Sequence, residues 1–191
     1  MENRPLRAVL FDRDGTLIRD VPYNGDPERV EPMPGAAEAV AQLRARGVAV
    51  GVVTNQSGIA RGLITAEQVE TVNARVDRLI GPFDVWAVCP HGEGEDCGCR
   101  KPAPGLIVDA MARLGVDPAE VAVIGDIGRD IEAAAAAGCR SMLIPTPVTL
   151  EREIDAAPEV ATTLADAVAL LLQPASPEDA GRHEVRRETV S

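Results

Sequence analysis

The sequence predicts an α/β fold, a three-layer Rossmann-like arrangement in which a parallel sheet has helices on both faces. Two observations lead to this prediction. Short apolar runs that are typical of buried strands occupy residues 9–11, 48–53 and 121–125. Longer stretches with helix-start and helix-stop residues occupy 34–46, 66–80 and 131–137. Strands that alternate with helices are typical of a parallel sheet with both faces covered.

The first apolar run ends at two carboxylates, Asp12 and Asp14, which Gly15 follows. Residues i and i+2 of a strand point to the same side, and a turn at Gly15 can bring the second carboxylate to face the first. Such a pair can divide nucleophilic attack and proton transfer between its members. An ordinary surface turn remains an alternative. A calcium loop is disfavoured, because Tyr23 stands where such a loop places its bidentate glutamate.

The next two runs also end at polar residues. Thr54 and Asn55 follow the second run, and Asp126 follows the third, with Asp130 four residues further on. In open parallel sheets, ligands bind at the carboxyl ends of the strands, which is where Asp12, Thr54 and Asp126 all fall. The three strands therefore predict one shared site.

The helical stretches are bounded by residues that favour helix ends. Pro34 opens the first stretch, Thr65 precedes the second as a predicted N-cap, and Gly138 closes the third. Residues 145–158 contain three prolines and predict a loop. Residues 159–172 predict a last amphipathic helix.

Two adjacent cations, Arg100 and Lys101, stand before Pro102. Adjacent like charges are usually a solvated surface feature, and this reading stays open. The prolines of residues 99–105 stiffen the backbone around the cations, which favours a positioned charge.

Three of the four cysteines gather with a histidine in the pattern C-x-H-x₅-C-x-C, formed by Cys89, His91, Cys97 and Cys99. Three thiolates and one imidazole close the tetrahedral shell of a structural zinc site. The spacing differs from the usual C-x₂-C finger, so free thiols and a disulfide remain alternatives. Cys139 stands apart and is expected to be an ordinary buried thiol.

Four segments together resemble the motifs of the haloacid dehalogenase superfamily of phosphohydrolases with an aspartate nucleophile. They are FDRDGT at 11–16, VVTNQSG at 52–58, RKPAPG at 100–105 and GDIGRD at 125–130. The longer strings TNQSGIARG and CPH…CxCRKPxPG are similar to the family of heptose-bisphosphate and histidinol-phosphate phosphatases. The resemblance covers about residues 7–145.

The resemblance implies a phosphomonoester substrate and a role for each motif. Asp12 would attack phosphorus and form an aspartyl-phosphate. Asp14 would act as the general acid and base, because it would protonate the leaving group and then deprotonate the attacking water. Thr54 and Lys101 would bind the non-bridging phosphoryl oxygens.

The resemblance also implies two metals. Mg²⁺ would be held by hard oxygens, namely the carboxylate of Asp12, the backbone carbonyl of Asp14 and the carboxylate of Asp126. Asp130 would orient Lys101 or a metal-bound water, with a simple charge at a helix N-terminus as the alternative. The family carries a structural zinc loop where the cysteine and histidine donors of this chain stand.

The short segments between the motifs predict a capless phosphatase, whose loops would contact the substrate directly. These loops are residues 19–33, residues 56–64 and the zinc loop at 89–102. Asn55, Arg61 and Arg100 are the candidate substrate-binding residues. Both arginines would suit a second anionic group, because a guanidinium offers a planar fork to phosphate oxygens, although either could be a surface charge.

The resemblance implies a small phosphorylated metabolite as substrate, first a heptose 1,7-bisphosphate that loses its 7-phosphate and second histidinol phosphate. A zinc-stabilised module that binds phosphorylated ligands without turnover is an alternative of another class, but it would not need both Asp12 and Asp14. The first loop lacks the expected glycine–tyrosine pair, and Ile127 stands where relatives often have lysine. Both departures concern the substrate side of the site.

Composition excludes other classes. Lysine and arginine number 19 against 30 acidic residues, and the net charge of −11 disfavours a nucleic-acid partner. No apolar run is long enough for a membrane span, so a cytoplasmic protein is expected. We expect a single phosphatase domain over residues 1–173, a disordered polar tail over residues 174–191, and a monomer.

Overall fold

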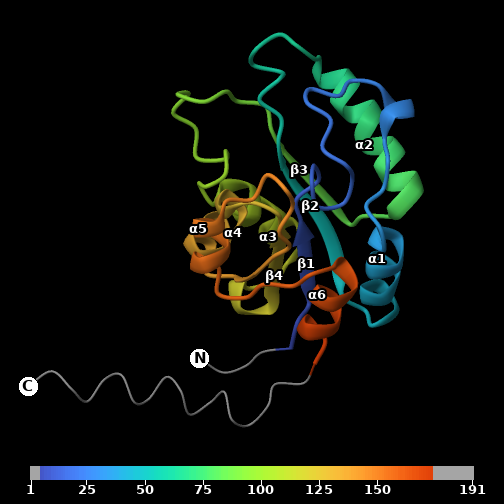
Figure 1. Cartoon of the computed structure of the whole chain (residues 1–191), viewed down its shortest axis with the longest axis vertical. Coiled ribbons are helices and arrows are strands. Elements are labelled where there is room, and N and C mark those ends of the chain that lie inside the picture. The colour runs from blue at the N-terminus through green and yellow to red at the C-terminus, as the bar shows by residue number, and fades with distance from the viewer. Residues whose placement is uncertain (1–4, 174–191) are drawn as a thin grey trace, which may run out of the picture.

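The computed structural model describes residues 5–173, which form one parallel sheet flanked by helices (Figure 1). The predicted tail at residues 174–191 lies outside these described residues. The strands are β1 (Ala8–Phe11), β2 (Ala49–Asn55), β3 (Val85–Cys89), β4 (Val121–Gly125) and β5 (Arg140–Leu143). They pair in the order β3-β2-β1-β4-β5, so the chain reverses its direction across the sheet between β1 and β4. Ligands bind at such switch points in α/β sheets.

Helices cover both faces of the sheet, as the sequence predicts. Those described are α1 (Ala36–Ala45), α2 (Ala66–Ile80), α3 (Gly105–Leu114), α4 (Gly128–Ala137), α5 (Glu151–Ala156) and α6 (Leu164–Leu171), with short 3₁₀ turns η1 (Pro27–Arg29) and η2 (Pro118–Glu120). Helices α1, α2 and α6 pack on one face, and α3 and α4 pack on the other (Figure 1). None of the helices between residues 5 and 173 has the length and apolar character of a membrane span.

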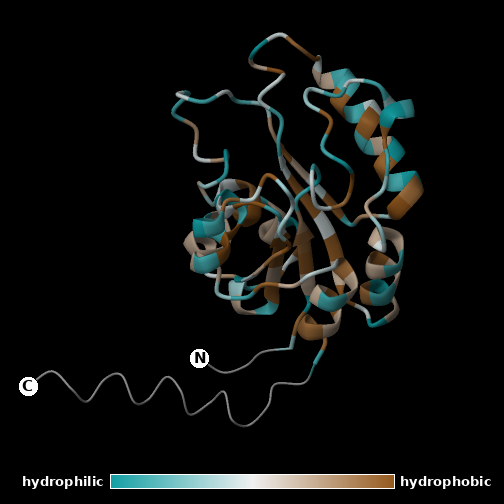
Figure 2. Ribbon diagram, in the orientation of Figure 1, coloured by the Kyte–Doolittle hydropathy of each residue, from teal (hydrophilic) through white to brown (hydrophobic). Residues whose placement is uncertain are grey.

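Alternate residues of each strand contribute to two separate cores. In β1, Val9 and Phe11 face α1, α2 and α6, whereas Ala8 and Leu10 face α3 and α4. All four side chains are fully buried. Figure 2 shows the hydrophobic strands between helices whose outer surfaces are hydrophilic. Burial on both faces explains why the strands read as continuous apolar runs.

Helix α2 has the predicted bounds. Thr65 accepts a hydrogen bond from the backbone N–H of Gln68, whose side chain accepts one from the Thr65 N–H in return. This capping box satisfies two donors at the start of the helix. Val72 and Val76 lie on its buried face.

The C-terminal part of the chain corrects two predictions. The loop expected at residues 145–158 contains α5, which its flanking prolines frame and do not interrupt. The helix expected at residues 159–172 begins only at Leu164, where Thr163 provides the cap. Val160 instead forms an isolated bridge with Leu143. The segment before α6 therefore forms a single bridge with β5, a pairing that helical periodicity alone does not reveal.

One strand was not predicted, and the bounds of another strand and of a helix also differ. The sequence analysis did not identify β3, although its run VWAVC is rich in strand-forming residues. Strand β2 continues through Thr54 and Asn55, which are therefore its last residues. Helix α4 begins at Gly128 and places Asp130 in its first turn.

Within residues 5–173, no further domain covers the strand ends. Between β1 and β2 the chain forms only η1, α1 and loops, and between β2 and β3 only α2 and loops. This part of the chain thus has the capless arrangement that the sequence predicts.

Candidate active site

Three carboxylates meet beyond the ends of β1 and β4. Asp12 follows β1, Asp126 follows β4, and Asp130 lies at the start of α4. One oxygen of each lies within 4.8 Å of the others, and all three side chains are buried. The meeting follows from the sheet, because β1 and β4 are parallel neighbours.

Lys101 reaches this carboxylate cluster from the loop between β3 and α3. Its Nζ donates to Asp12 Oδ1 at 2.6 Å, to Asp130 Oδ1 at 2.6 Å and to the Val53 carbonyl at 2.8 Å. These acceptors replace the water of an ammonium group that is only 3% exposed. Asp12 Oδ2 accepts no hydrogen bond from any residue between 5 and 173. One oxygen of the predicted nucleophile is therefore open to a ligand.

The carboxylate cluster has an excess of negative charge, with three acids against one ammonium. Burial raises the pKa of Asp12 well above its usual range, and Asp130 and Asp126 add to this effect while Lys101 opposes it. Burial, reinforced by Asp130, raises the pKa of Asp126 to about 7. Burial alone would lower the pKa of Lys101, but Asp12 and Asp130 outweigh it and raise that pKa. A divalent cation would balance the two excess charges.

The available ligand atoms fit a hard cation such as Mg²⁺, because all are oxygens. Asp130 uses one oxygen on Lys101 and the other on the backbone of Ile127. The carboxylate of Asp126 has only long contacts with hydroxyl groups, at 3.4 and 3.5 Å. The Asp14 carbonyl accepts no backbone hydrogen bond within the described chain. The groups predicted to bind Mg²⁺ are therefore those whose oxygens are least occupied.

Gly15 brings the backbone of the first motif against Asp126. Its φ of +86° is left-handed, and a Cβ at this position would collide with the Asp126 carboxylate. Glycine is needed here both for the turn and for the close approach.

The Asp14 carboxylate lies outside the carboxylate cluster and has its own partners. Arg13 donates to its two oxygens, in each case at 3.1 Å, and Gln56 Nε2 donates to Oδ2 at 2.8 Å. Gln56 also donates to Thr54 Oγ1 at 2.9 Å, which ties the first motif to the second. The sequence analysis assigned no role to Arg13 or Gln56. Both lie inside recognised motifs, but arginine is usually exposed, so its burial had no signal in the pattern.

Asn55 binds the backbone of Lys101. Its Nδ2 donates to the Lys101 carbonyl and its Oδ1 accepts from the Lys101 N–H, both at 3.1 Å. These two bonds attach the loop that carries the lysine to the end of β2. Asn55 therefore positions Lys101 in this structure, and its predicted contact with substrate stays a prediction.

The four zinc-ligand candidates form a compact cluster beyond the end of β3. They are Cys89, His91, Cys97 and Cys99. The Cys89 sulfur lies 3.9 Å from that of Cys97 and 3.2 Å from that of Cys99. His91 Nδ1 lies 3.5 Å from the Cys89 sulfur and 3.2 Å from that of Cys99. A tetrahedral zinc ion with Zn–S bonds of about 2.3 Å spaces its sulfurs by about 3.8 Å, so the cluster has the size of a zinc site.

The chemistry of this zinc cluster also favours a metal. All four cysteines are free in this structure, and the sulfurs of the cluster lie 3.2 Å or more apart, beyond the length of a disulfide bond. Burial, followed by the neighbouring thiols, raises the pKa of Cys99 to about 12. A bound cation is therefore needed to hold this sulfur as a thiolate. Cys139 is half-buried away from the cluster, where burial raises its pKa to about 11.

The two arginines predicted to bind an anionic group have partners within the chain. Arg100 donates to the backbone carbonyl of His91 at 3.3 Å and pairs with Glu93 at 3.4 Å. Arg61 donates to the Tyr23 hydroxyl at 2.7 Å and lies 5.8 Å from the centre of that ring. Arg100 thus connects two parts of the zinc loop. Arg61 connects the loop at residues 56–64 to the loop at residues 19–33. Their roles toward a substrate stay predictions.

The loop after β5 contributes two residues that the sequence analysis did not find. Thr149 Oγ1 donates to the Asp126 carbonyl at 2.6 Å, and Thr146 Oγ1 lies 3.4 Å from Asp126 Oδ2. Threonines near prolines are common in any loop, so the sequence held no specific signal for this contact.

Carboxylates and a lysine at the carboxyl ends of a Rossmann-like sheet are suited to phosphoryl transfer. The family model of the haloacid dehalogenase-like hydrolases matches residues 23–138. The chain belongs to the haloacid dehalogenase-like hydrolases.

Relatives with assigned activities resemble this chain over most of its length. The D-glycero-beta-D-manno-heptose-1,7-bisphosphate 7-phosphatase of Salmonella typhi is 40% identical over 173 residues, which cover 83% of this chain and 92% of the relative. The enzyme of the same name from Bordetella bronchiseptica is 36% identical over 146 residues, or 74% of this chain and 82% of the relative.

A solved structure has the same fold. The crystal structure of D,D-heptose 1,7-bisphosphate phosphatase from B. bronchiseptica, complexed with magnesium and phosphate, has a TM-score of 0.81 at 34% identity. The match covers 89% of this chain and 100% of that one. That structure holds magnesium, a cation that suits the carboxylate oxygens of this chain, together with phosphate.

Proposed function

We propose that this protein is a magnesium-dependent phosphatase that removes the 7-phosphate of D-glycero-D-manno-heptose 1,7-bisphosphate. The observation that carries the phosphatase assignment is the buried carboxylate cluster, in which Lys101 binds one oxygen of Asp12 and leaves the other open. The sugar is supported by the named relatives, which resemble this chain over most of their own length.

In the first step, Asp12 Oδ2 attacks phosphorus. A bond forms between this oxygen and phosphorus, the bond from phosphorus to the sugar oxygen breaks, and the electron pair of that bond passes to the sugar oxygen. Asp14 supplies the proton that this oxygen takes. Lys101 and the Thr54 hydroxyl stabilise the charge on the non-bridging oxygens. Asp12, the Asp14 carbonyl and Asp126 would hold Mg²⁺, which would supply charge neutralisation at the phosphoryl group.

In the second step, water hydrolyses the aspartyl-phosphate. Asp14, now a carboxylate, takes a proton from the water as the water oxygen bonds to phosphorus. The bond between phosphorus and Asp12 breaks, and its electron pair returns to the carboxylate. Phosphate leaves, and both acids regain their starting states.

The proposal also includes the contacts of the second phosphate group, the oligomeric state and the cellular compartment. The 1-phosphate of the substrate would contact the loops at residues 56–64 and 89–102, where Arg61 and Arg100 are the candidate cations. The protein would act as a single domain over residues 1–173, as a monomer, on a small molecule in the cytoplasm. The net charge of −11 disfavours a nucleic-acid partner.

The proposal is tested by phosphate release from purified protein with Mg²⁺. The substrates are both anomers of the heptose 1,7-bisphosphate and histidinol phosphate, and kcat/KM is compared among them. We expect one heptose anomer to have the highest value. A higher value for histidinol phosphate would replace the substrate, and no release from any phosphomonoester would favour a binding module without turnover.

A further inference from the structure

Arg13 stands between the two catalytic acids in the sequence, yet its side chain is only 1% exposed. It is among the largest fully buried side chains of the described residues. A guanidinium group removed from water is stable only when charge and hydrogen-bond partners replace the solvent. Its partners here are Asp14 and Asn73. The proposed mechanism uses Asp14 but gives no role to Arg13 or Asn73.

The contact between Arg13 and Asp14 fixes the plane of the carboxyl group. Arg13 Nε donates to Oδ2 and Nη2 donates to Oδ1, both at 3.1 Å. A two-point contact of this kind restricts rotation, which a single hydrogen bond does not. Oδ2 also accepts from Gln56, so Oδ1 is the oxygen with the larger remaining capacity to carry a proton.

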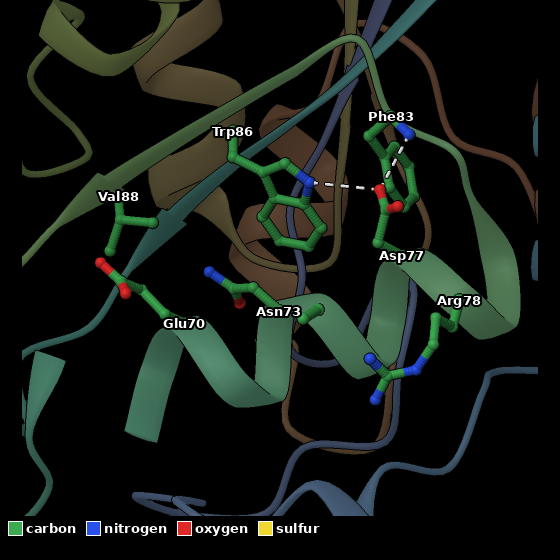
Figure 3. Close-up of a pocket in the computed structure, with 8 residues that line it drawn as sticks. Glu70, Asn73, Asp77, Arg78, Phe83, Trp86 and Val88 are labelled. Atoms are coloured by element: carbon green, nitrogen blue, oxygen red, sulfur yellow. Dashed lines mark hydrogen bonds between the residues drawn. The ribbon is translucent and has the colours of Figure 1, made fainter. Parts of the chain in front are cut away.

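Asn73 holds the guanidinium group from the opposite side. Its Oδ1 accepts from Arg13 Nη1 at 2.6 Å. Asn73 is a polar residue on the buried face of α2, where the other buried residues are Val69, Val72, Val76 and Ile80. Figure 3 shows its side chain between Glu70 and Trp86, in a groove that α2 forms with β3. The bond to Arg13 explains why an amide occupies this position.

We propose that Arg13 and Asn73 are positioning residues for Asp14 in proton transfer to the leaving group. Arg13 orients the carboxyl group, and Asn73 holds Arg13 in the position from which it can do so. When the Asp14 proton passes to the sugar oxygen, the carboxylate that remains is already paired with a guanidinium. The inference rests on the proposed function, because it concerns one step of that reaction.

The test compares two leaving groups. A sugar alkoxide needs a proton as it departs, whereas p-nitrophenolate is stable as an anion and departs without one. The value of kcat/KM reports the first chemical step and the binding before it, so loss of proton transfer should lower it selectively for the sugar phosphate. A general loss of structure would lower both values together.

Two variants remove different parts of the arrangement. Asn73→Leu keeps the approximate volume but removes the acceptor for Arg13. Arg13→Lys keeps the positive charge but removes the planar guanidinium group that contacts both oxygens of Asp14. For each we expect kcat/KM to fall by about 10- to 100-fold with the sugar phosphate, but by less than about threefold with p-nitrophenyl phosphate.

Matched controls separate positioning from packing. Val76→Ala removes buried volume from the same face of α2, so we expect a similar small change with both substrates. Asn73→Asp keeps the acceptor oxygen and should restore the wild-type ratio between the two substrates. Equal losses with both substrates in Asn73→Leu, or no loss at all, would overturn the inference.

The wild-type protein distinguishes this inference from the proposed function. If it fails on the heptose bisphosphate but hydrolyses another alkyl phosphate, the substrate assignment falls and the ratio is measured with that alkyl phosphate instead. If it hydrolyses neither an alkyl phosphate nor p-nitrophenyl phosphate, both proposals fall.

Discussion

The two candidate metal sites of this molecule are built in opposite ways. The carboxylate cluster takes Asp12 and Asp126 from the ends of two strands that lie far apart in the sequence, and all its side chains are buried. The zinc cluster takes all its donors from residues 89–99, and most of them are only partly buried. The first site therefore depends on the sheet for its assembly, whereas a metal can close the second within one loop.

The two sites meet at Lys101. This residue lies two positions after Cys99, the last donor of the zinc cluster, and its ammonium group lies in the carboxylate cluster. Asn55 attaches the same residue to β2. The sheet thus positions the acids, whereas the zinc loop supports Lys101, whose ammonium group pairs with them.

The largest expected effect comes from a change that disables the carboxylate cluster alone. Asp12→Asn keeps the shape of the side chain but removes the nucleophile, so we expect kcat to fall by about 10⁴-fold or more. Zinc content by elemental analysis and the circular dichroism spectrum should match wild type. Activity within about tenfold of wild type would contradict the nucleophile assignment.

Lys101→Met tests the residue that the two sites share. The change leaves Asp12 and Asp130 buried without their ammonium partner, which typically costs about 3–5 kcal/mol of stability. Loss of a donor to the phosphoryl oxygens should lower kcat by about 10²- to 10³-fold. Unfolding in denaturant measures the stability, with the exposed Arg113→Met as control. Equal stability of the two variants would count against the buried pairing.

Loss of the zinc cluster should have a smaller effect on catalysis, because it acts only through the loop. We expect Cys99→Ser to lose bound zinc and to lower kcat by about 10- to 100-fold. Cys139→Ser, which changes a thiol outside the cluster, should keep both zinc and activity. Full activity of zinc-free Cys99→Ser would break the proposed link between this loop and Lys101.

The smallest effect is the pH dependence of Mg²⁺ binding. Asp126 has its pKa raised to about 7, chiefly by burial. A proton held by this acid competes with the cation, so affinity for Mg²⁺ should fall as pH drops below 7, by about tenfold per unit. Calorimetric titration at pH 8, 7 and 6 measures it. An affinity that stays constant over this range would show that Asp126 is not the titrating ligand.

Local patterns predicted most of the fold. The bounds of α2 could be predicted because Thr65 and Gln68 form a cap that depends on neighbouring residues alone. The meeting of Asp12 with Asp126 could be predicted because the carboxyl ends of parallel strands share one edge of a sheet. These conclusions required no knowledge of distant partners.

The features that the sequence did not predict depend on partners far along the chain. Arg13 is buried because Asn73, sixty positions away, and Asp14 satisfy its guanidinium group. Val160 pairs with Leu143 instead of continuing the helix. The chemistry of a side chain indicates which kind of hydrogen-bond or charge partner it requires when buried. It does not indicate which residue is that partner, so such contacts are known only from the tertiary structure.

The close approach of Gly15 to Asp126 sets a rule for engineering this site. A side chain at position 15 collides with the carboxylate, so random replacement of Gly15 alone should return only glycine among active clones. Altered metal preference is better sought in libraries that vary positions 15 and 126 together, since a shorter ligand at one leaves space for a side chain at the other.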